Sequence, residues 1–115
     1  MMNINAHTAQ TFFGVRGPRR GGEGWQIDIN GQPHSVKIKN ITSEEVRFEL
    51  TPPSDGNNSL SLKPGKGNDV LGLWGIPEIG LGVNKILEPF NPGYPRRAII
   101  IFDAPRKFEI NRIGS

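Results

Sequence analysis

Short runs of alternating apolar and polar residues, each ended by glycine or proline, constrain the fold of this chain more than any other feature. The chain holds 15 glycines and 10 prolines among 115 residues. Both residue types interrupt regular elements and favour turns. Because no run is long enough for a helical crossover, the pattern predicts antiparallel pairing. We therefore expect an all-β fold, an antiparallel β-sandwich of immunoglobulin-like or jelly-roll type with about seven or eight short strands, and a small β-barrel as the alternative.

Alternation also identifies the buried faces of the strands. Trp25, Ile27 and Ile29 alternate with polar residues, which indicates a half-buried strand. Asn30 and Gly31 follow directly and give the strongest short hairpin signal in the sequence. The expected core consists of the apolar residues on one face of this and similar runs: Trp25, Ile27, Ile29, Val36, Ile38, Val46, Phe48, Leu50, Leu60, Leu62, Ile100, Phe102, Phe108 and Ile110.

The length of the chain fits one domain with one core, so we assign residues 1–115 to a single β domain. Residues 1–11 are expected to form a loose N-terminus. Residues 14–24 contain five glycines and three arginines with Pro18 and Glu23, and are expected to form a loop. The sequence NKILE at positions 84–88 is where we expect a helical turn, ended by Pro89.

Two segments supply more apolar surface than a small core between two sheets needs. Residues 98–102 are apolar on both faces, which predicts a strand covered on both sides or one that meets a partner. Residues 71–83, LGLWGIPEIGLGV, carry one charge in the whole segment. This segment is either a hairpin that closes the core or an exposed loop that inserts into a partner with Trp74 as its anchor. Together the two segments favour self-association into a homo-oligomer.

Positive charge gathers at the two ends of the chain. The net charge is +3, and residues 1–24 carry three arginines against one glutamate. Arg16, Arg19 and Arg20 lie in the glycine-rich loop, and guanidinium groups suit phosphate, sulfate or carboxylate partners. Arg96 and Arg97 extend this anion-binding surface if the fold brings the ends together. The sequence therefore allows binding of nucleic acid or another polyanion.

Residue types needed for catalysis are sparse. The chain has no cysteine and two histidines, and no pattern with the spacing of metal ligands, a nucleophile elbow or a phosphate-binding loop. Glu44 and Glu45 are adjacent acidic residues in an expected turn, where they point in different directions. We therefore expect no enzyme, no catalytic residue, no metal and no cofactor.

Aromatic residues offer a different chemistry. Tyr94, in an Asn-Pro-Gly-Tyr turn, and Trp25 are candidates for a platform on which a sugar ring stacks. With Trp74 they are the predicted ligand- or partner-binding residues. The sequence thus favours a non-catalytic binding or assembly module that recognises a protein partner or a glycan through its loops and the glycine-rich apolar segment. A basic protein that binds nucleic acid or another polyanion is the alternative.

The N-terminal ten residues lack the basic and apolar regions of a secretory signal. The longest uninterrupted apolar run, residues 98–102, is far too short for a transmembrane segment. The absence of cysteine is compatible with the cytosol but does not fix the compartment. The location is therefore unknown, and the lack of a visible signal makes the cytoplasm the expected one.

Overall fold

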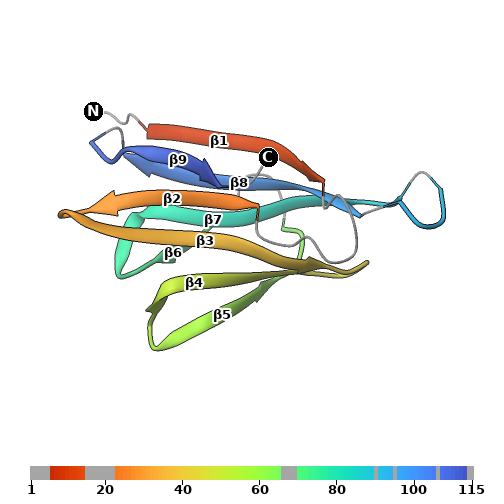
Figure 1. Cartoon of the computed structure of the whole chain (residues 1–115), viewed down its shortest axis with the longest axis horizontal. Helices are drawn as coiled ribbons and strands as arrows, with labels where there is room; N and C mark the ends of the chain where they lie inside the picture. The colour runs from red at the N-terminus through yellow and green to blue at the C-terminus, as the bar shows by residue number, and fades with distance from the viewer. Residues whose placement is uncertain are drawn as a thin grey trace.

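The computed structural model describes residues 6–14, 23–65, 70–89, 91–94, 96–105 and 107–113, and only the backbone of residues 6–14. The described residues form nine strands and no helix (Figure 1). In chain order the strands are β1 (Ala6–Gly14), β2 (Gly24–Ile29), β3 (Gln32–Ile41), β4 (Val46–Ser54), β5 (Asn57–Leu62), β6 (Leu71–Leu73), β7 (Ile76–Leu87), β8 (Arg97–Pro105) and β9 (Ile110–Ile113).

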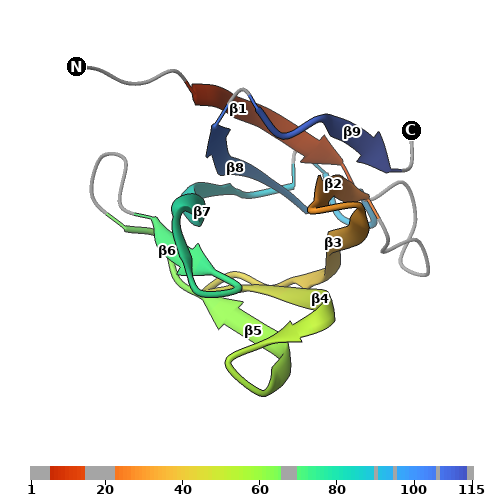
Figure 2. The same ribbon diagram turned by 90° about the vertical axis from the view of Figure 1, so that its left-hand side faces the viewer.

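The described strands form two antiparallel sheets, as expected for a β-sandwich. Sheet A has the order β1-β8-β7-β6, and sheet B has the order β5-β4-β3-β2-β9. Most hydrogen-bonded neighbours follow each other in the chain, and only β1 and β9 pair with distant strands (Figure 2). Strands β2 to β5 form one meander and strands β6 to β8 another, while β1 and β9 lie beside strands that are distant in the chain. The all-β antiparallel class predicted from the sequence is confirmed.

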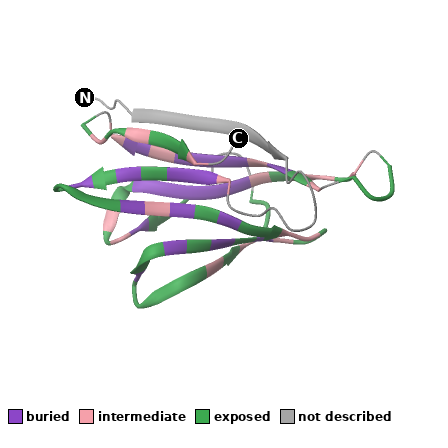
Figure 3. Cartoon of the chain, viewed as in Figure 1, coloured by how far each residue is buried: buried purple, intermediate pink, exposed green. Residues whose placement is uncertain are grey.

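One apolar core lies between the two sheets. All residues of the predicted core from Trp25 to Leu50, together with Ile100 and Phe102, are buried, and the other four are half-buried. The Trp25 ring of sheet B stacks on the Phe102 ring of sheet A, with the ring centroids 5.1 Å apart. In β2 and the first half of β4, buried and exposed residues alternate as the sequence predicts, whereas residues 79–83 of β7 are buried in a row (Figure 3). The core also includes residues that the prediction omitted: Leu73, Ile79, Leu81, Val83, Ala98 and Ala104.

Three hairpins turn through two residues that both have positive φ. The turn pairs are Asn30 with Gly31, Asp55 with Gly56, and Trp74 with Gly75. Positive φ at both positions is the mark of the type I′ turn, whose twist matches that of the flanking strands. All three turns, together with the connection from β8 to β9, lie at one end of the long axis (Figure 1). We call this end the turn end.

Two local expectations were wrong. Residues 6–14 form β1, which pairs with β8 along its whole length from Ala6 to Gly14, so the chain is not loose as far as residue 11. Backbone hydrogen bonds to β8 hold β1 in place, although its sequence is only weakly apolar and gave no strand signal. Residues 84–87 continue β7 instead of forming a helical turn, because Lys85, Ile86 and Leu87 pair with β8 after a register shift.

Within the part of the chain that the structure describes, no helix could cross a membrane.

Candidate functional site at the turn end

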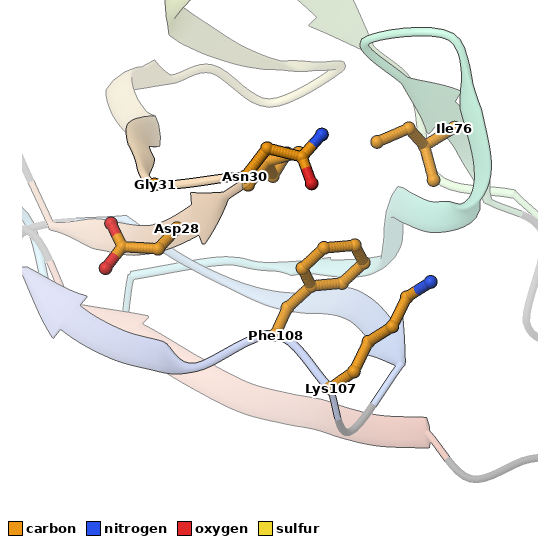
Figure 4. Close-up of a pocket in the computed structure, with 7 residues that line it drawn as sticks. Asp28, Asn30, Gly31, Ile76, Lys107 and Phe108 are labelled. Atoms are coloured by element: carbon orange, nitrogen blue, oxygen red, sulfur yellow. The ribbon is translucent and has the colours of Figure 1, made fainter.

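An open pocket of about 490 Å³ lies at the turn end (Figure 4). Three apolar residues line it, of which Ile29 is buried and Ile76 and Phe108 are half-buried. Its rim is polar, and the rim side chains of Asp28, Asn30 and Lys107 belong to exposed residues. The volume falls within the range of small-ligand sites, which is about 300–1,000 Å³.

Three separate elements supply the walls of the pocket. The β2–β3 turn contributes Asn30 and Gly31, whose φ angles of 53° and 82° fix the direction of the turn. The start of β7 contributes Ile76. The connection between β8 and β9 contributes Lys107 and Phe108, and the Phe108 N–H donates a 3.0 Å hydrogen bond to the Pro105 carbonyl. The pocket therefore joins parts of both sheets.

Trp74 fastens sheet A to sheet B beside this pocket. Its backbone N–H donates to the Ser54 hydroxyl and its ring N–H donates to the Pro52 carbonyl, both at 2.8 Å. Its ring meets the buried His34 edge-on, with the centroids 4.9 Å apart. We call these contacts the Trp74 clamp. Trp74 has a φ of 56°, an uncommon value for a bulky residue that only surrounding contacts can maintain.

The charged groups at the rim are of opposite sign. Asp28 carries a carboxylate and Lys107 an ammonium group, and in Figure 4 they lie on opposite sides of the Phe108 ring. The Lys107 Nζ lies 5.2 Å from the centroid of that ring, a distance at which a cation is attracted to the ring face. The Asn30 amide points over the ring toward Ile76 (Figure 4). The Asp28 carboxylate points away from the Phe108 ring, so the pocket offers the Asn30 amide, the Lys107 ammonium group and an aromatic surface (Figure 4).

The structure separates the three aromatic residues singled out from the sequence. Trp25 is 2% exposed and belongs to the core, so its place among the contact residues was wrong. Its position in a half-buried strand already favoured the core. Trp74 is half-buried and already engaged by Ser54, Pro52 and His34, which favours the hairpin interpretation of residues 71–83. Tyr94 is 58% exposed and lies in the connection between β7 and β8, at the other end of the molecule (Figure 1).

The predicted anion-binding arginines are only partly described. Arg16, Arg19 and Arg20 lie outside the described residues. Arg97 is exposed and pairs with Gly14 at the end of β1. Arg96 binds the Glu88 carboxylate at 2.7 Å, which offsets its charge. These two arginines lie at the end of the molecule opposite the turn end (Figure 1).

The apolar segments that favoured self-association are largely buried within the fold of the chain itself. In residues 98–102, Ala98, Ile100, Ile101 and Phe102 are buried, and β8 lies between β1 and β7. In the described part of residues 70–83, only Val70 and Leu71 are large apolar residues that remain exposed. Self-association therefore stays a prediction, with the edge strand β6 as its remaining apolar surface.

Sequence reasoning missed four polar or aromatic pocket residues: Asp28, Asn30, Lys107 and Phe108. Asn30 was interpreted only as a turn residue, and Phe108 only as part of the core. The available signal was the Lys107-Phe108 pair between two strands, because an aromatic residue in a short connection often stays partly exposed. What the sequence does not show is the pairing of β9 with β2, which brings this connection next to the β2–β3 turn.

Among the described residues, no cluster of three or more histidine and acidic residues has the arrangement of a metal site. Comparison with protein-family models, with curated proteins and with solved structures finds no match to this chain.

Proposed function

We propose that this protein is a non-catalytic binding module and that the turn end is its recognition surface. The pocket carries the proposal, since a concave site that combines apolar side chains with polar groups such as Asn30 and Lys107 is typical of ligand recognition. Type I′ turns support it, because a fixed turn loses little conformational entropy when a ligand binds. The pocket lining contains a single carboxylate and no histidine, which suits binding better than acid–base chemistry.

Fragment screening by nuclear magnetic resonance tests this proposal. A library of small sugars, amino acids and short peptides is added to the ¹⁵N-labelled chain, and the backbone amide shifts are mapped. We expect the largest saturable shifts at residues 28–31, 76 and 107–109. If the shifts gather elsewhere, for example around Tyr94, or if no fragment gives saturable shifts at the turn end, the proposal is wrong.

Binding of a polyanion at the opposite end is the second candidate function. It is favoured by the β1–β8 register, which pairs Gly14 with Arg97, while Arg16 follows Gly14 by two residues in the sequence. Heparin chromatography tests it. We expect the chain to be retained at low salt, and Arg97→Gln to elute at lower salt than the original chain. Passage through the column at low salt would exclude this function.

A further inference from the structure

The outer edge of β5 is open to pairing with a further strand. β5 ends the order of sheet B and, among the described strands, is hydrogen-bonded to β4 alone. It lies at the margin of the molecule in both Figure 1 and Figure 2. One side of its backbone therefore presents N–H and C=O groups that a further strand can bind.

This edge lacks the features that normally keep sheet edges from pairing. Residues 57–62, NNSLSL, contain no charged residue and no proline, which are the usual protections of an edge strand. The register shift between β4 and β5 adds residues to β4 and none to β5. Two other edge strands are less suited to pairing, because β6 has three residues, and β9 has four and contains Arg112.

The side chains of β5 divide between the two faces of sheet B. Leu60 and Leu62 are half-buried and pack against the core. Asn57, Ser59 and Ser61 alternate with them on the opposite face and are exposed. A strand added to this edge would cover the exposed parts of the two leucines while it pairs with the backbone of β5.

Charges at the two ends of β5 favour a second copy of this chain as the added strand. Asp55 precedes β5 and Lys63 follows it, and both residues are exposed. If two copies pair antiparallel about Ser59, Asp55 of each copy lies opposite Lys63 of the other, so charges of opposite sign meet at both ends of the ladder. The edge strand β1 has no such arrangement, since no acidic residue precedes Glu23 in the sequence.

From these observations we propose that the protein forms a two-fold symmetric dimer in which the β5 strands of two copies pair antiparallel about Ser59. The two copies of sheet B then join into one continuous sheet, and Leu60 becomes a diagonal neighbour of the partner's Leu60. So short a ladder buries little surface, so the association is of the weak class. The dimer goes beyond the proposed function, because none of the residues that line the pocket belongs to β5.

Sedimentation equilibrium at increasing concentration tests the dimer. Concentrations from about 10 μM to about 1 mM cover the affinities expected of a small interface. We expect the mean mass to rise toward that of a dimer, and the amide signals of residues 57–62 of the ¹⁵N-labelled chain to shift with concentration. A chain that stays monomeric over the whole range would overturn the proposal and leave β5 as an edge for a strand of another protein.

Ser59→Lys assigns the dimer to β5. Ser59 is exposed, so the change leaves the core intact, but in the dimer it places two like charges opposite each other at the two-fold axis. We expect it to weaken dimerisation at least tenfold, on the order of the effect of like charges in directly opposed positions. Gln26→Lys is the matched control, because Gln26 is exposed on the internal strand β2, and it should leave dimerisation unchanged. A dimer that persists in Ser59→Lys forms through another surface and contradicts the proposal.

An exchange of charges tests the register. Asp55→Lys and Lys63→Glu each bring like charges together at both ends of the ladder, and each should weaken its own dimer about tenfold. In a mixture of the two variants, the introduced lysine of one faces the introduced glutamate of the other, and the original Lys63 faces the original Asp55. We therefore expect the mixture to dimerise as tightly as the original chain. If the mixture dimerises no better than the separate variants, the pairing about Ser59 is wrong.

Discussion

The hydrogen bond from the Trp74 N–H to the Ser54 hydroxyl is the contact whose removal tests the Trp74 clamp most directly. Ser54 is 7% exposed, and its Oγ accepts this bond at 2.8 Å. Ser54→Ala removes the oxygen without adding volume. The Trp74 N–H then loses this acceptor in a part-buried position, and the backbone of Trp74 keeps its left-handed conformation with one support fewer.

The expected loss of stability follows from the lost hydrogen-bond acceptor and from the lost support of the Trp74 backbone. Leaving a buried N–H without an acceptor costs about 1–3 kcal/mol. Because the site is only part-buried, we expect Ser54→Ala to lower the free energy of unfolding by about 1–2 kcal/mol. A left-handed residue other than glycine stores a further strain of about 1–2 kcal/mol, so the turn is also expected to become more mobile in this variant.

Urea unfolding followed by circular dichroism measures the effect. Ser61→Ala is the matched control, since Ser61 is exposed on β5, and it should change the free energy of unfolding by less than about 0.5 kcal/mol. If Ser54→Ala lowers the free energy of unfolding by no more than this control does, the clamp does not stabilise the fold. If Ser54→Ala lowers the free energy of unfolding by much more than about 3 kcal/mol, the Ser54 hydroxyl stabilises more than this one hydrogen bond.

A pair of variants at Trp74 isolates the strain. Both Trp74→Ala and Trp74→Gly remove the ring, but only glycine adopts the observed φ of 56° without strain. Relief of strain favours the glycine variant, while the greater chain entropy of glycine opposes it. The net expectation is that Trp74→Gly is more stable than Trp74→Ala by about 0.5–1 kcal/mol. If Trp74→Gly is less stable than Trp74→Ala by about 0.5–1 kcal/mol, the full entropy cost of glycine, the turn is not strained.

Three further predictions follow from packing and charge. Gly24→Ala should destabilise the chain by more than about 3 kcal/mol, because the added Cβ would lie directly against the backbone of the paired strand β3; melting close to that of the original chain would contradict this packing. In Trp74→Phe the remaining tryptophan fluorescence comes from Trp25, which is 2% exposed, so acrylamide should hardly quench it, and strong quenching would place Trp25 outside the core. Glu88→Gln frees Arg96 from its ion pair, so retention on heparin should increase while stability changes by less than about 0.5 kcal/mol; unchanged elution would exclude Arg96 from an anion-binding surface.

Alternation and turn residues carried most of the fold prediction. Hairpin formation at Asn30 and Gly31 was predicted correctly because both residues adopt positive φ at little cost. Positions on one face of each alternating run became the core, since register fixes which side chains point inward. These signals are local, and a single segment of sequence contains all the information that they need.

Nonlocal pairing explains the errors. β1 is weakly apolar and lacks an internal signal, yet it pairs with β8, some ninety residues later in the chain. Residues 84–87 have a sequence that suits a helical turn, but the ladder to β8 extends β7 through them. In both cases hydrogen bonds to a distant strand outweigh local preference, as is usual for β-structure.

The candidate site illustrates the same limit. Trp25 and Trp74 attract attention in the sequence as large aromatic residues, but one lies in the core and the other fastens the two sheets together. Phe108 is less conspicuous and becomes a candidate contact residue only because the β8–β9 connection crosses between the sheets next to the β2–β3 turn. Recognition residues on loops therefore depend on strand order, which residue patterns do not encode locally.

Stability and the proposed recognition are connected through the Trp74 clamp. Asn30 reaches the pocket from sheet B, whereas Ile76 reaches it from sheet A, two residues after Trp74. The clamp joins the β6–β7 turn to the end of β4, so it sets how far apart these two walls stand. A ligand that touches both walls binds best when their separation is fixed in advance. The contacts of the clamp maintain the strained φ of Trp74. In doing so they hold in place the β6–β7 turn, which leads directly into Ile76 in the wall of the pocket.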